Sequence, residues 1–74
     1  MTVLAGTLKV RVNDRARDLP QGSALLVLLE EMGLGDRRGV AVAVNATVVP
    51  RGEWASRALA EGDQVLVIQG SQGG

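Results

Sequence analysis

Residues Gln64–Gln69 read Gln-Val-Leu-Val-Ile-Gln, the strongest strand pattern in this chain of 74 residues. Four apolar residues stand together, three of them β-branched, and such side chains are typical of strands. The turn residues Glu61-Gly62-Asp63 precede this run and Gly70 follows it. We therefore expect the last strand of the domain here, with a flexible tail, residues 70–74, leaving from its end.

The first part of the chain is predicted to form a hairpin. Apolar and polar residues alternate over residues 8–13, as they do in a strand with one buried face. Asn13-Asp14 suits a tight reversal, because Asn and Asp tolerate left-handed backbone angles. Residues 16–19 then form the return strand, which Pro20-Gln21-Gly22 interrupts.

A helix is predicted from Ala24 to Met32, with the Ser23 side chain as its N-terminal cap and Gly33 as its stop. Leucine and methionine recur at spacings i, i+3, i+4 and i+7, which gives the helix one core face. That face consists of Leu25, Leu28, Leu29 and Met32. Leu26 and Val27 widen the apolar stripe; we interpret them as the rim of the core, and a partner-contact patch is the other reading.

A second apolar run, Val40–Val44, alternates valine with alanine between turn residues. This pattern indicates a strand inside the sheet, with large side chains on one face and small ones on the other. Asn45-Ala46-Thr47 is expected to turn into Val48-Val49, which Pro50 ends because proline cannot donate to a ladder.

The order hairpin, helix and further strands describes an α+β domain, with one main helix across one face of a mixed sheet. A β-grasp arrangement fits this order, and it places the first and last strands side by side and parallel at the sheet centre. We expect residues 1–69 to form this single domain. Residues 1–6 either precede its first strand or lengthen it.

Composition excludes several function classes. Eight basic residues balance eight acidic ones, which disfavours binding to nucleic acid or to an acidic membrane through bulk charge. The chain has no Cys and no His, so neither a thiolate metal site nor the commonest general base is present. We expect no enzyme activity of its own, no resident metal and no bound cofactor. Only Val3-Leu4-Ala5 stands before Gly6, too short for the apolar part of a signal peptide, so a cytoplasmic location is predicted.

The remaining conspicuous side chains are interpreted structurally. Trp54 is the only aromatic residue and is expected to close one end of the core. Arg51, the pair Arg37-Arg38 and the pair Glu30-Glu31 are most simply solvent-facing charges. None of these is assigned to a site.

The last two residues, Gly73-Gly74, carry the functional hypothesis. Two residues without a β-carbon can pass through a narrow channel, so a partner enzyme can bring the terminal carboxylate to a phosphate. The other interpretation is a frayed terminus without a role.

Several short motifs in fixed order resemble the ThiS family, the ubiquitin-like sulfur carriers of thiamine thiazole synthesis. They are Val-Asn-Asp at 12–14, Val-Ala-Val-Asn at 42–45, Val-Val-Pro-Arg at 48–51, Trp54, Glu-Gly-Asp at 61–63 and the terminal Gly73-Gly74. Two features depart from the family pattern: residues 1–6 precede the usual first strand, and Gly70-Ser71-Gln72 is more polar than the usual tail.

The resemblance implies a mechanism and partners. A ubiquitin-activating-like enzyme would use ATP to adenylate the carboxylate of Gly74, and Gly73 would let the tail enter two different active sites. Sulfur derived from cysteine through a desulfurase or a related route would then give a thiocarboxylate. Thiazole synthase would take up that sulfur, which makes the chain a co-substrate.

Three other functions stay open at this point. The small subunit of molybdopterin synthase would share the fold and the diglycine chemistry. A carrier for another sulfur metabolite, or a protein-conjugating modifier, would also use Gly74. A β-grasp interaction module would use no terminal chemistry at all.

Overall fold

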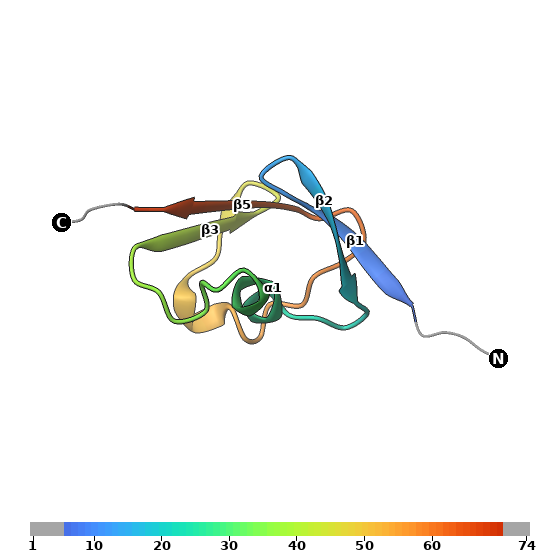
Figure 1. Ribbon diagram of the computed structural model, residues 1–74, viewed down its shortest axis with the longest axis horizontal. Coiled ribbons are helices and arrows are strands. Elements are labelled where there is room, and N and C mark those ends of the chain that lie inside the picture. Colours follow the sequence, from blue (N-terminus) through green and yellow to red (C-terminus); the bar gives the residue numbers. More distant parts are fainter. Residues whose placement is uncertain (1–5, 71–74) are drawn as a thin grey trace.

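The computed structural model describes residues 6–70 of the chain. Within them the elements follow the order β1 (Thr7–Val12), β2 (Arg15–Pro20), α1 (Leu25–Glu31), β3 (Val40–Val44), β4 (Thr47–Val48), a 3-10 turn η1 (Arg51–Glu53) and β5 (Gln64–Gln69). The strands form one mixed sheet in the order β2-β1-β5-β3-β4, and α1 lies across one of its faces (Figure 1). This is the predicted α+β, β-grasp architecture.

Strand β5 occupies the centre of the sheet. It runs parallel to β1, with Val65 opposite Val12, and antiparallel to β3 along its whole length. The predicted parallel pairing of the first and last strands is therefore confirmed. The chain leaves β5 at Gly70, at the end of the sheet that lies away from the start of β1 (Figure 1).

Two tight turns close the hairpins, and both begin with asparagine. Asn13 and Asp14 have φ values of 52° and 70°, and Asn45 and Ala46 have 51° and 70°. Both turns are of the type whose twist matches the flanking strands. The asparagine side chains also bond to the backbone of β5, so each turn helps to hold the central strand. The Asn13-Asp14 turn is confirmed. The second turn consists of Asn45 and Ala46, and Thr47, which was expected in it, already belongs to β4 (Thr47–Val48), one residue before the predicted strand at Val48-Val49.

The helix begins differently from the prediction. It spans Leu25–Glu31, and Ala24 and Met32 are its cap positions. Ser23 does not cap it, because its hydroxyl donates to the carbonyl of Pro20 at 2.7 Å. The first N–H groups of α1 instead donate to the carbonyls of Arg57 and Trp54, at 2.8 and 3.0 Å. The prediction of a Ser23 cap was wrong because the connection before β5 supplies these acceptors from a distant part of the sequence.

One apolar core lies between α1 and the sheet. Leu25, Leu28 and Leu29 are fully buried in it, and Met32 packs at its margin. Leu26 lies partly buried at the rim, as expected, whereas Val27 is exposed. From β3, Val42 and Val44 point inward while Ala41 is exposed, as the alternation predicted. The other core residues are Leu8, Val10, Val12, Leu19, Leu34, Val49, Trp54, Leu59, Val65 and Val67.

Candidate functional site

The root of the tail is tied to the folded body. The N–H of Gly70 donates to the carbonyl of Gly39 at 2.6 Å, which extends the β3–β5 ladder by one residue. The two backbones are close: a Cβ on Gly39 would lie 3.3 Å from the Gly70 oxygen, and one on Gly70 would lie 3.2 Å from the Gly39 oxygen. Gly39 also has a φ of 76°, which glycine adopts without strain. We call this contact the Gly39–Gly70 clasp.

The sulfur-carrying residue predicted from the sequence, Gly74, and its neighbour Gly73 lie outside the described residues. Their roles stay predictions, as does the division into a body of residues 1–69 and a tail of residues 70–74. Gly70, the first residue of that tail, is the only one of it that the structure describes.

The face of the sheet opposite α1 is apolar and open over β5, β3 and β4, whereas on β1 it carries Lys9 and Arg11. On β5, Val65 and Val67 point into the core, whereas Leu66 and Ile68 are 51% and 54% exposed. Val48 on β4 is 71% exposed. Since large apolar side chains are rarely gathered in the open without a purpose, this group is a candidate contact surface.

Strand register makes these side chains neighbours. Ala41 pairs with Ile68, and Ala43 pairs with both Leu66 and Val48. The small alanines leave a shallow hollow of ≈ 130 Å³ between the larger side chains. We call Ala41, Ala43, Val48, Leu66 and Ile68 the open face.

Sequence reasoning did not identify the open face, although a signal for it was present. The apolar content of Leu66–Ile68 correctly predicted a central strand. However, an unbroken apolar run places apolar side chains on both faces of a sheet, and within residues 6–70 one α-helix covers a single face. The alternate residues of β5 are therefore exposed.

Arg51 makes contacts beyond those predicted. Its guanidinium lies 4.5 Å from the centroid of the Trp54 ring and donates to the carbonyls of Gly35, at 3.2 Å, and Arg37. Arg51 is exposed, as predicted, but its guanidinium also binds a backbone loop 14 to 16 residues earlier, a contact that the sequence did not indicate. Trp54 itself is buried, as predicted, and its indole N–H donates to the carbonyl of Val49 at 2.9 Å.

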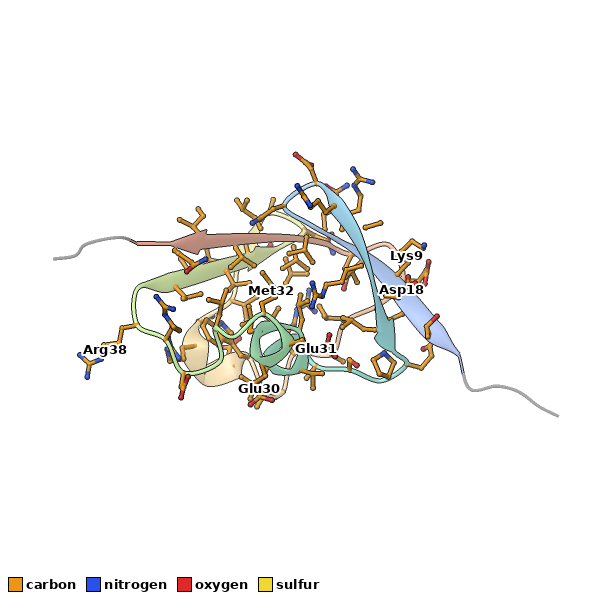
Figure 2. The ribbon with its side chains drawn as sticks, in the orientation of Figure 1. Lys9, Asp18, Glu30, Glu31, Met32 and Arg38 are labelled. Atoms are coloured by element: carbon orange, nitrogen blue, oxygen red, sulfur yellow. The ribbon has the colours of Figure 1, made fainter. Side chains whose placement is uncertain are left out.

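The other charged pairs are exposed, in agreement with the prediction. Arg37 and Arg38 lie beside the Gly39–Gly70 clasp, and Arg38 extends past the end of the sheet (Figure 2). Glu30 is exposed on α1. Its neighbour Glu31 forms an ion pair with Arg17 at 3.5 Å, a contact that the sequence did not indicate.

Two kinds of feature are absent from residues 6–70. Acidic side chains do not gather in threes at a spacing that could hold a metal ion. No helix in this part of the chain has the length and apolar character needed to cross a membrane.

Comparisons with known proteins agree on one family. The sequence model of the ThiS family matches residues 5–74. The sulfur carrier protein ThiS of Escherichia coli (strain K12) is 36% identical over 69 residues, which cover 90% of this chain and all of that protein. The crystal structure of a thiamine biosynthesis protein (ThiS) from Geobacter metallireducens superposes with a TM-score of 0.75 at 20% identity. It covers 90% of this chain and 100% of its own. This last likeness supports the β-grasp fold.

Proposed function

Because the chain belongs to the ThiS family of sulfur carrier proteins, we propose that it carries sulfur on Gly74 for the thiazole ring of thiamine. The observation that carries this proposal is the full-length match to a sulfur carrier, in a family match that reaches through Gly74. The Gly39–Gly70 clasp adds support, since it starts the tail from a fixed point on the body. The chain acts as a co-substrate of partner enzymes in the cytoplasm, where ATP is supplied.

The chemistry begins at the terminal carboxylate. A carboxylate is a poor electrophile because its negative charge repels nucleophiles. An adenylating enzyme joins the Gly74 carboxylate to the α-phosphate of ATP and releases pyrophosphate, which leaves an acyl adenylate. The terminal sulfur of a persulfide derived from cysteine, supplied by a desulfurase or a related route, then displaces AMP and forms an acyl disulfide. A second thiol reduces this acyl disulfide, so that the thiocarboxylate is released and the two thiols leave as a disulfide. The resulting thiocarboxylate gives its sulfur to thiazole synthase, and the carrier returns to the carboxylate form.

The two final glycines suit this task. Neither residue has a side chain that could collide with the walls of a channel, and each can take backbone angles closed to other residues. Four residues follow Gly70, and a fully extended chain of four residues spans at most roughly 14 Å. The reacting phosphate must therefore come within about this distance of Gly70 in the complex.

The open face serves as the docking surface for the adenylating enzyme. Leu66 and Ile68 lie on β5, the same strand that continues into the tail. An enzyme that packs on these side chains holds the root of the tail at a fixed distance from its ATP. The partner surface is apolar, because burying the open face against polar groups would leave those groups without hydrogen bonds.

A reconstituted reaction tests the function. The purified chain is mixed with ATP and the adenylating enzyme of the same organism, and pyrophosphate release is measured. We expect release from the intact chain and none from a chain without Gly74, with both chains folded. Mass spectrometry of the carrier isolated from its own cells should reveal a fraction with one oxygen replaced by sulfur.

Growth identifies the pathway. Cells that lack this chain should fail to grow without thiamine and should recover when the thiazole precursor is supplied. Recovery should also follow from the intact chain but not from the chain without Gly74. Normal adenylation combined with growth that needs no thiazole would reassign the carrier to another sulfur pathway.

A further inference from the structure

Arg51 joins three separate parts of the molecule. It opens η1, its guanidinium stacks on Trp54, and two of its nitrogens donate to the carbonyls of Gly35 and Arg37. The planar guanidinium presents several donors in a fixed fork, so it can hold two backbone carbonyls at once. Arg51 thus fixes the loop that leads from α1 to β3.

Trp54 gives this arrangement a rigid base. The ring is 2% exposed and its N–H is bonded to Val49, so its position is set by the core. Because the ring is fixed, the Arg51 guanidinium that stacks on it is restricted in position as well. The loop carbonyls of Gly35 and Arg37 are consequently held relative to the core, although they lie at the surface.

The same loop ends at the root of the tail. Two residues after Arg37, the carbonyl of Gly39 accepts the N–H of Gly70. At its other end the loop is anchored by Leu34, which is buried and donates its N–H to the carbonyl of Leu29 at 2.8 Å. A continuous chain of contacts therefore runs from Trp54 through Arg51 and the loop to the Gly39–Gly70 clasp.

We propose that Arg51 is a positioning residue for the tail. By fixing the loop, it holds Gly39 in place and so sets the point and direction in which the tail leaves the body. This inference rests on the proposed sulfur-carrier function for its kinetic consequence. Arg51 lies in the Val-Val-Pro-Arg motif, and the inference gives that motif a task in tail delivery without contact to the partner.

A backbone measurement on the isolated chain tests whether Arg51 holds the Gly39–Gly70 clasp in place. We compare NMR order parameters of the N–H of Gly70 with those of Val67, which is held independently by Asn13. In the unmodified chain both should be near 0.85, a value typical of rigid backbone. In Arg51→Lys, Gly70 should fall below about 0.6 while Val67 stays unchanged. Lysine keeps the charge but cannot bridge two carbonyls with one fork.

Two further variants serve as controls in the NMR experiment. Arg15→Lys makes the same exchange on β2, at an exposed position, and should leave Gly70 rigid. Gly39→Ala strains the clasp directly at its φ of 76° and keeps Arg51, so it should loosen Gly70 even if Arg51→Lys fails to fold. An unchanged Gly70 in folded Arg51→Lys, or in Gly39→Ala where Arg51→Lys does not fold, would overturn the proposal.

Adenylation kinetics test the consequence for the tail. With the open face intact, Arg51→Lys should leave the KM for the carrier within about twofold and lower kcat by about tenfold, as expected when a reacting group is misplaced. A raised KM with unchanged kcat would refute the positioning role and make Arg51 a docking contact. Failure of the unmodified chain to be adenylated would refute the sulfur-carrier function instead. The NMR comparison would still decide whether Arg51 holds the Gly39–Gly70 clasp in place.

Discussion

The side chain of Asn13 and the backbone of Val67 exchange two hydrogen bonds. The Asn13 Nδ2 donates to the Val67 carbonyl at 3.1 Å, and the Asn13 Oδ1 accepts the Val67 N–H at 2.8 Å. In the β1–β5 backbone pairing, Arg11 and Val12 lie opposite Gln64 and Val65, and the N–H of Asn13 adds a bond to the Val65 carbonyl at 2.9 Å. The side-chain amide of Asn13 therefore continues the ladder two residues further along β5 than its own backbone N–H reaches.

Replacing Asn13 should destabilise the fold measurably. Asn13→Gly tolerates the φ of 52° but loses both bonds, which should lower the free energy of unfolding by about 2 kcal/mol. Asn13→Ala should cost more, because alanine is also strained at this φ. Urea unfolding of the three chains gives both differences. Equal stability of Asn13→Gly and the unmodified chain would show that water replaces these bonds without cost.

Trp54 provides both a probe and a prediction. As the only aromatic residue, it reports unfolding by fluorescence without interference. Trp54→Phe should lower the free energy of unfolding by about 2 kcal/mol, since the carbonyl of Val49 loses the indole N–H as its donor. The variant is followed by circular dichroism because its fluorescence is lost. A loss under about 0.5 kcal/mol would mean that the carbonyl finds another donor, because surface substitutions ordinarily change the free energy of unfolding by up to about this amount.

A charge on the open face should impair docking and spare the fold. Leu66→Glu exchanges a side chain that is half exposed, so thermal unfolding should change little. The KM for the carrier in adenylation should rise at least about tenfold, because a carboxylate would be buried against an apolar partner. Val27→Glu places the same charge on exposed apolar surface of α1 and serves as the matched control. Equal KM values for the two variants would contradict docking on the open face.

A side chain in the diglycine should block the reaction itself. Gly73→Val should lower the rate of adenylation by at least about a hundredfold. A β-branched residue restricts the backbone angles available to the tail, and its side chain can collide with the walls of the enzyme channel. Gln72→Val, one residue earlier, is the matched control and should retain most of the activity. Circular dichroism should find both variants folded. Similar rates for the two would contradict the predicted role of Gly73.

The elements that the sequence predicted correctly are those set by neighbouring residues. The Asn13-Asp14 reversal and the Val-Ala alternation of β3 follow from local backbone preferences and from side-chain period. The start of α1 could not be predicted in this way. Its N–H groups donate to the carbonyls of Trp54 and Arg57, which lie 28 and 32 residues after their donors Leu26 and Leu25. No local sequence pattern indicates these acceptors.

The candidate site divides along the same line. The diglycine stays a prediction, and the sequence permits that prediction because the proposed chemistry needs only the two residues themselves. Arg51 and the open face depend on what tertiary structure places near each side chain: two loop carbonyls accept hydrogen bonds from the exposed Arg51 guanidinium, and nothing within residues 6–70 covers Leu66 and Ile68. A comparison of the number of apolar sheet faces with the number of helices would have indicated the open face. No feature of the sequence indicated the contacts of Arg51.

The central place of β5 has a consequence for how the protein is made. Among the described elements, the strand that joins both halves of the sheet is the last to be synthesised, and its partner β1 is the first. A nascent chain that ends before β5 leaves the inner side chains of β1 and β3 without the strand between them, so this domain folds only after β5 has been synthesised. Truncated products therefore stay unfolded and are open to proteolysis. Any chain that reaches the folded state already contains the strand from which the tail extends.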